Sequence, residues 1–113
     1  LGVDDVGNIV LKDRLTLAED GVLVAVVCVG KSDGKLLCPP QVVSRGCFFS
    51  GDVNSFETIE DVKRIIAAEV PKYVFNRILE VDSLKQSIQR TVKQYFKHKL
   101  KRNPIVLSVV TEI

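Results

Sequence analysis

The chain has 113 residues, the length of one domain, and its 46% apolar and 27% charged residues give an ordinary globular balance. This balance excludes a disordered, collagen-like or low-complexity protein. The longest apolar run, Val22–Val29, is far shorter than the roughly 20 residues of a transmembrane helix, so no membrane partner is expected. Three cysteines without a Cys-x-x-Cys pair indicate reduced thiols in a cytosolic protein.

The first 20 residues follow neither a helical nor a strand period for long. We interpret residues 1–20 as a linker that contains a short strand at 8–11, and residues 21–113 as the folded domain. The chain starts at Leu1 and contains no methionine, which indicates a piece cut from a longer protein.

The domain is predicted to open with a strand at Val22–Val29, which is Val-rich and apolar at every position. Such a run is typical of a strand buried on both faces. A turn is expected at 30–35, because Asp-Gly between apolar runs favours a hairpin. The return strand should start at 35–38, break at the two prolines 39–40 and resume at 41–44.

Two helices are predicted next. The first begins at Thr58, with Thr58 and Asp61 as its N-terminal cap. Pro71 ends it, kinks it, or starts a second short helix through Val74 and Ile78. Its apolar positions at helical spacing are Ile59, Val62, Ile65 or Ile66, and Val70.

The second main helix is predicted over 83–102, where Ser83 and Gln86 match a capping box. Asn103 and Pro104 stop it, and 104–113 form a final strand. Its apolar stripe consists of Leu84, Ile88, Val92, Tyr95, Phe96 and Leu100. The resulting order is β-β-α-α-β. We therefore expect an α+β fold, a small two-layer domain in which two main helices cover one face of an about three-stranded sheet.

The sequence contains no complete catalytic or metal-binding constellation, so the chain alone is not expected to be an enzyme. Residues 30–34 match Gly-x-Ser-x-Gly, but the following segment is strand-like and the only histidine is the distant His98. A hairpin turn explains these residues better than a nucleophilic Ser32. One histidine and three scattered cysteines do not supply a zinc site. We expect no catalytic residue, metal or cofactor in this chain.

The charge is uneven along the chain, since residues 83–113 carry seven basic residues and one acidic residue. The pattern is typical of an RNA-binding helix. It is also the pattern of a solvated face whose lysines suit the C-terminal end of the helix dipole. The candidate RNA contacts are Lys93, Lys97, Lys101 and Arg102.

Adjacent Phe48 and Phe49 are candidates for a protein interface. A sheet with helices on one face leaves a second face to cover. Core packing within the domain explains these two residues as well, and both interpretations remain open.

Four segments carry a family resemblance: 3–14 (VDDVGNIVLKDR), 17–24 (LAEDGVLV), 43–46 (VSRG) and 101–113 (KRNPIVLSVVTEI). In this order they resemble the carboxyl end of bacterial ribonuclease J, of the metallo-β-lactamase/β-CASP family. The resemblance implies that this chain is the linker plus the small C-terminal α/β domain. It also implies that the zinc ligands and catalytic residues lie in a missing catalytic domain.

The resemblance further implies the function of a non-catalytic domain in a cytoplasmic endoribonuclease and 5′→3′ exoribonuclease. Such enzymes act in RNA processing, rRNA maturation and mRNA decay. The implied partners are a second copy, as a homo-oligomer (dimer or tetramer), or a paralogue in a hetero-oligomer, with RNA bound through the full-length enzyme. The residues do not decide which paralogue this is. The alternative function is an RNA-binding accessory domain acting through the helix 83–102.

Overall fold

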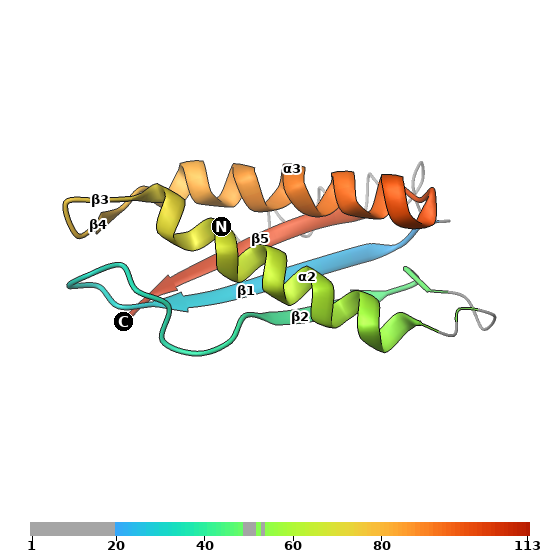
Figure 1. Cartoon of the computed structure of the whole chain (residues 1–113), viewed down its shortest axis with the longest axis horizontal. Helices are drawn as coiled ribbons and strands as arrows, with labels where there is room; N and C mark the ends of the chain where they lie inside the picture. Colours follow the sequence, from blue (N-terminus) through green and yellow to red (C-terminus); the bar gives the residue numbers. More distant parts are fainter. Residues whose placement is uncertain (1–19, 49–51, 53) are drawn as a thin grey trace, which may run out of the picture.

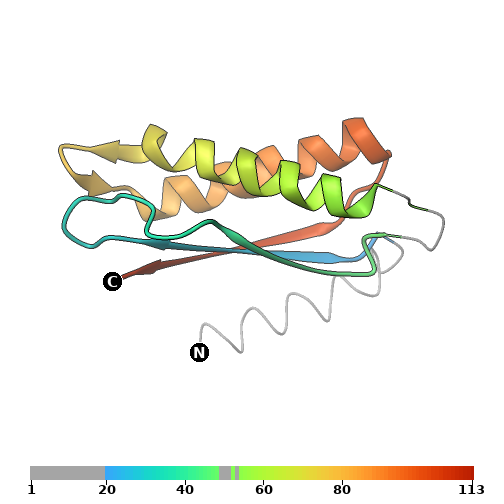
Figure 2. The same cartoon turned by 60° about the horizontal axis from the view of Figure 1, so that its bottom comes forward.

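The computed structural model describes residues 20–48, 52 and 54–113. The predicted strand at 8–11, the linker apart from Asp20, and Phe49 lie outside the described residues. Within them, three longer strands form one sheet and two long helices lie together on one of its faces (Figures 1 and 2). The predicted two-layer α+β fold is therefore confirmed.

The sheet has the strand order β2-β1-β5. Strand β1 (Val22–Val29) is central, and pairs antiparallel with β2 (Gln41–Arg45) and parallel with β5 (Ile105–Glu112). Parallel neighbours need a long crossover connection, which the two helices provide here. The strands predicted at the start and the end of the domain are both confirmed.

Burial alternates along β1, although the sequence predicted burial on both faces. The side chains that face the helices are fully buried: Leu23, Ala25, Val27 and Val29. Their neighbours on the other face are only half-buried: Val22, Val24, Val26 and Cys28. The prediction is wrong on this point because both described helices lie on the same side of the sheet (Figure 2).

The turn at 30–35 is confirmed by its backbone hydrogen bonds. The Gly34 N–H donates to the Gly30 carbonyl oxygen over 2.8 Å, and the Lys35 N–H donates to Asp33 Oδ1 over 2.9 Å. The return strand is broken. Leu36 forms only an isolated bridge with Val29, and pairing resumes at Gln41, after the two prolines.

The helices are α2 (Ser55–Glu69) and α3 (Val81–Leu100). Both start before their predicted caps. Thr58 is buried within α2, whose N-cap is Asn54, and Ser83 lies in the first turn of α3. The predicted capping roles of Thr58 and Ser83 are therefore wrong. Lys101 ends α3 in the left-handed conformation, with φ 57°.

Pro71 follows the end of α2 and lies in a 3₁₀ turn, η1 (Val70–Tyr73). The chain then forms a short hairpin of β3 (Val74–Phe75) and β4 (Ile78–Leu79), so a second helix through this segment is excluded. The turn residues Asn76 and Arg77 have φ of 54° and 66°. A two-residue hairpin turn with positive φ at both positions normally ends in glycine. An arginine there costs about 1–2 kcal/mol.

The core lies between the helices and the sheet. The predicted stripe of α3 is confirmed, because Leu84, Ile88, Val92 and Phe96 are all fully buried. A buried carboxylate links the C-terminal end of α2 to the N-terminal part of α3. Glu69 on α2 accepts hydrogen bonds from Ser87 Oγ and, over 2.6 Å, from Lys72 Nζ. Burial by itself would raise the pKa of Glu69, but these hydrogen bonds outweigh it and lower the pKa.

Candidate interaction surfaces

The face of the sheet turned away from α2 and α3 is largely apolar. The strand register fixes which side chains share it, since partners in neighbouring strands point to the same side. Val24 lies between Val43 and Leu107, and Val26 lies between Gln41 and Val109. We call the apolar set the open face: Val22, Val24, Val26, Cys28, Val43, Ile105, Leu107 and Val109.

Two members of the open face are strongly exposed. Val43 is 51% exposed and Val109 is 44% exposed, and Arg45 and Thr111 lie at its polar margins. Among the described residues no helix covers this face (Figure 2). A contiguous apolar surface with a polar rim is typical of a protein–protein interface. The sequence predicted that the sheet has a second face that needs a partner. It did not predict which residues form that face, because they come together only through the pairing of β1 with β5.

The long helix α3 carries most of the predicted RNA contacts. Lys93 and Lys97 are exposed on the surface of α3, and Lys101 is exposed at its C-terminal cap. Lys97 and Lys101 also line a hollow of about 500 Å³ together with His98, Arg102, Asn103 and Asp20. Three of the four predicted contacts are thus available to a phosphate backbone.

Arg102 is placed differently. Its guanidinium forms a two-pronged ion pair with Asp52, at 2.7 and 3.1 Å, and donates to the carbonyl oxygen of Cys47 over 3.0 Å. Its side chain is 14% exposed. The hydrogen bond to Asp52 raises the pKa of Arg102. Arg102 thus fastens the end of α3 to the segment after β2.

Lys99 lies on another side of α3, facing α2. Its Nζ is 4.0 Å from Asp61 Oδ2 and 5.9 Å from the centre of the Tyr95 ring. The Tyr95 hydroxyl donates to the same carboxylate over 2.9 Å, and Arg64 pairs with it too. Asp61, predicted as a helix cap, instead ties α2 to α3.

Phe48 is half-buried and packs on Phe96, with ring centres 5.9 Å apart. This contact gives Phe48 a place at the edge of the core. Phe49 lies outside the described residues. The interface role of both stays a prediction.

Of the three cysteines, Cys47 is buried, and it lies two residues beyond the end of β2. Its thiol donates to the Val22 carbonyl oxygen over 3.3 Å. Burial raises the pKa of this thiol to about 11, so it stays protonated at neutral pH. A protonated, buried thiol is a packing group and a poor nucleophile.

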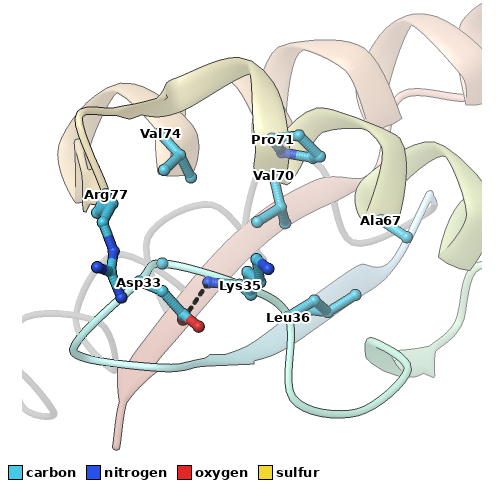
Figure 3. A pocket seen from close by; sticks show the side chains of 9 residues that line it. Asp33, Lys35, Leu36, Ala67, Val70, Pro71, Val74 and Arg77 are labelled. Atoms are coloured by element: carbon cyan, nitrogen blue, oxygen red, sulfur yellow. Dashed lines mark hydrogen bonds between the residues drawn. The ribbon is translucent and has the colours of Figure 1, made fainter.

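A pocket of about 580 Å³ opens where the β1–β2 turn approaches the β3–β4 hairpin (Figure 3). Its walls are aliphatic and come from two separate stretches of the chain: Leu36 from one, and Ala67, Val70, Pro71 and Val74 from the other. Its rim carries Asp33, Lys35 and Arg77. Sequence reasoning missed this pocket because no local pattern marks residues that meet only in the tertiary structure.

The part of the chain that the structure describes contains no cluster of three metal-ligating side chains. No helix within that part combines the length and the apolar character needed to cross a bilayer.

Comparison with known proteins supplies the family. Residues 9–113 match the family model of the ribonuclease J C-terminal domain. The chain is 29% identical over 113 residues to ribonuclease J2 of Bacillus subtilis (strain 168), and 31% identical over 113 residues to ribonuclease J 2 of Staphylococcus epidermidis. It is 32% identical over 115 residues to ribonuclease J 2 of Staphylococcus saprophyticus.

Each alignment covers 100% of this chain but 20% of the relative. The chain therefore spans about a fifth of the length of the curated relatives that it matches. The family match runs through every element of the described fold, from β1 to β5. The chain belongs to the ribonuclease J C-terminal domain family.

Proposed function

We propose that this chain is the non-catalytic part of a cytoplasmic, zinc-dependent ribonuclease that processes and degrades RNA, and that it supports self-association of that enzyme. The cutting chemistry and the zinc ligands then lie in the catalytic part of the full-length protein. The observation that carries the proposal is the open face, an apolar sheet surface in a domain of this family.

The open face suits contact between two copies of the domain. Its centre is aliphatic, and Val43 and Val109 are exposed on the two outer strands. Burying such side chains contributes roughly 25 cal/mol per Å² of apolar surface. A homo-oligomer, or a hetero-oligomer with a paralogue that presents a similar face, would remove this surface from water.

Replacing Val43 and Val109 together by lysine should weaken self-association at least about tenfold, because two charges would be buried in an apolar contact. Both side chains are exposed, so the fold should tolerate the change. Sedimentation of the 113-residue chain over a range of concentrations measures the effect. Gln86→Lys combined with Gln94→Lys is the matched control, since it adds two charges at exposed positions of α3, away from the open face.

Two results would contradict self-association. One is an unchanged dissociation constant in the double variant. The other is a wild-type chain that stays monomeric at all concentrations, combined with a full-length enzyme that remains oligomeric after this domain is removed.

Direct RNA binding through α3 is the second candidate function. It is favoured by the exposure of Lys93, Lys97 and Lys101 and by the hollow that two of them line. Binding to phosphates releases counterions, so affinity should fall as the salt concentration rises. Two other basic residues in this region, Arg102 and Lys99, already lie beside carboxylates and add less to such a surface.

Replacing Lys93, Lys97 and Lys101 by glutamate should remove most of the affinity for a 20-nucleotide single-stranded RNA. Because three lysines would no longer neutralise phosphates, the slope of log affinity against log salt should become shallower by about 2. The control variant carries the same charge change elsewhere, at Lys31, Lys35 and Arg45, which are also exposed. No binding by the wild type at low salt would reject this function.

A further inference from the structure

The pocket between the two hairpins is separate from both surfaces described above. It lies at the end of the molecule where β1, α2 and the β3–β4 hairpin meet (Figure 3). Gly34 makes this approach close, because a Cβ at this position would lie 3.1 Å from Val74 Cγ2 and 3.4 Å from Leu79 Cβ. The β1–β2 turn and the β3–β4 hairpin thus pack closely together and line the same pocket.

The interior of the pocket suits an aliphatic guest. Leu36, Val70 and Val74 line it together with Ala67 and Pro71, and its residues include no aromatic ring. Nucleic-acid bases are usually held by stacking on aromatic rings, and this pocket offers none. A leucine- or isoleucine-sized side chain is the better match for these walls.

The rim suits a carboxylate beside that side chain. Arg77 points toward the β1–β2 turn in Figure 3, where Lys35 lies beside Asp33. Asp33 is engaged within its own turn, where its carboxylate accepts from the Lys35 N–H. No ion pair to Arg77 is found among residues 20–48, 52 and 54–113.

Arg77 also has a backbone conformation that is unfavourable for a residue with a side chain. Its φ of 66° belongs to the left-handed region, which glycine adopts without strain. Such outliers cluster at functional sites, where the side chain is kept in spite of the strain. Here the strained residue is the one that places a guanidinium on the pocket rim.

From these observations we infer that the pocket is a docking site for a protein segment that presents an aliphatic side chain next to an acidic residue. The aliphatic side chain enters between Leu36, Ala67 and Val74, and the carboxylate meets the Arg77 guanidinium. This site is independent of self-association, because none of its residues belongs to the open face. It would connect the domain to a separate partner protein.

The test is a titration of the ¹⁵N-labelled 113-residue chain with a ten-residue peptide that carries one leucine between two aspartates. Backbone amide shifts should change around the pocket, at 33–36, 67, 70 and 72–77. The same peptide with lysines in place of the aspartates, or with serine in place of the leucine, should bind at least about tenfold more weakly.

Two variants separate binding from folding. Arg77→Gly should lower affinity for the acidic peptide about tenfold or more while leaving the melting temperature equal or higher, since it removes strain. Asn76→Gly relaxes the neighbouring position of the same turn and keeps the guanidinium, so it should bind like the wild type. Ala67→Phe fills the pocket and should abolish the shifts.

The inference is overturned if the acidic peptide causes no shifts at the pocket, or if Arg77→Gly binds it as tightly as the wild type. It is also overturned if a ten-nucleotide oligouridylate shifts the pocket amides and the peptide does not. None of these results bears on the concentration dependence of self-association, so the two proposals fail separately.

Discussion

Replacing Gly21 by alanine is expected to lower the free energy of unfolding by about 3 kcal/mol or more, because a strained backbone and a clash act together. Gly21 has a φ of 83°, which alanine adopts only at a cost. Its Cβ would also lie 2.5 Å from the Arg45 carbonyl oxygen and 2.6 Å from the Cys47 nitrogen. These are backbone atoms, which cannot move aside as the end of a side chain can.

The position of Gly21 explains why the damage would spread through the domain. It immediately precedes β1, and its carbonyl oxygen accepts a hydrogen bond from the Ile105 N–H over 2.9 Å at the start of β5. The clash partners lie at the end of β2. A shift at this point therefore disturbs all three strands of the sheet.

Urea unfolding followed by circular dichroism measures the loss. Gly46→Ala is the matched control, because its φ of 74° is similar but a Cβ there would meet only the Gly21 Cα, at 3.5 Å. It should cost about 1–2 kcal/mol. A Gly21→Ala chain as stable as the Gly46→Ala chain would show that the close approach is not rigid.

The sequence predicted the elements with the strongest local patterns. The valine-rich run gave the bounds of β1, and the stripe on α3 gave its buried residues. The caps at Thr58 and Ser83 were wrong because each helix begins a few residues earlier, with Asn54 and Glu80 at the N-cap positions. The β3–β4 hairpin was missed because its turn carries Arg77 where a glycine would have marked it.

The surfaces were harder to predict than the elements. The lysines of α3 follow from helical spacing, so their exposure could be read from the sequence. The engagement of Arg102 with Asp52 could not, since 50 residues separate them along the chain. The open face depends on the parallel pairing of β1 with β5, and the pocket depends on two stretches of the chain, 33–36 and 67–77, that meet only in the folded chain.

Replacing Phe96 by alanine is expected to cost about 3–5 kcal/mol, because a fully buried ring leaves a large cavity. Phe96 lies on α3 and contacts the rings of both Phe48 and Tyr95. Urea unfolding of the single variants measures the cost. Phe56→Ala is the control, since this side chain on α2 is 75% exposed and its removal should change stability by less than about 0.5 kcal/mol.

A double-mutant cycle with Phe48→Ala then decides the role of Phe48. If Phe48 belongs to the core of one domain, the two rings should couple by about 0.5–1.5 kcal/mol, as expected for their 5.9 Å separation. The Phe48→Ala chain would then self-associate like the wild type. If Phe48 also serves as an interface residue, Phe48→Ala should in addition raise the dissociation constant of self-association measured by sedimentation. The cycle and the sedimentation measurement together separate the two interpretations that the sequence left open.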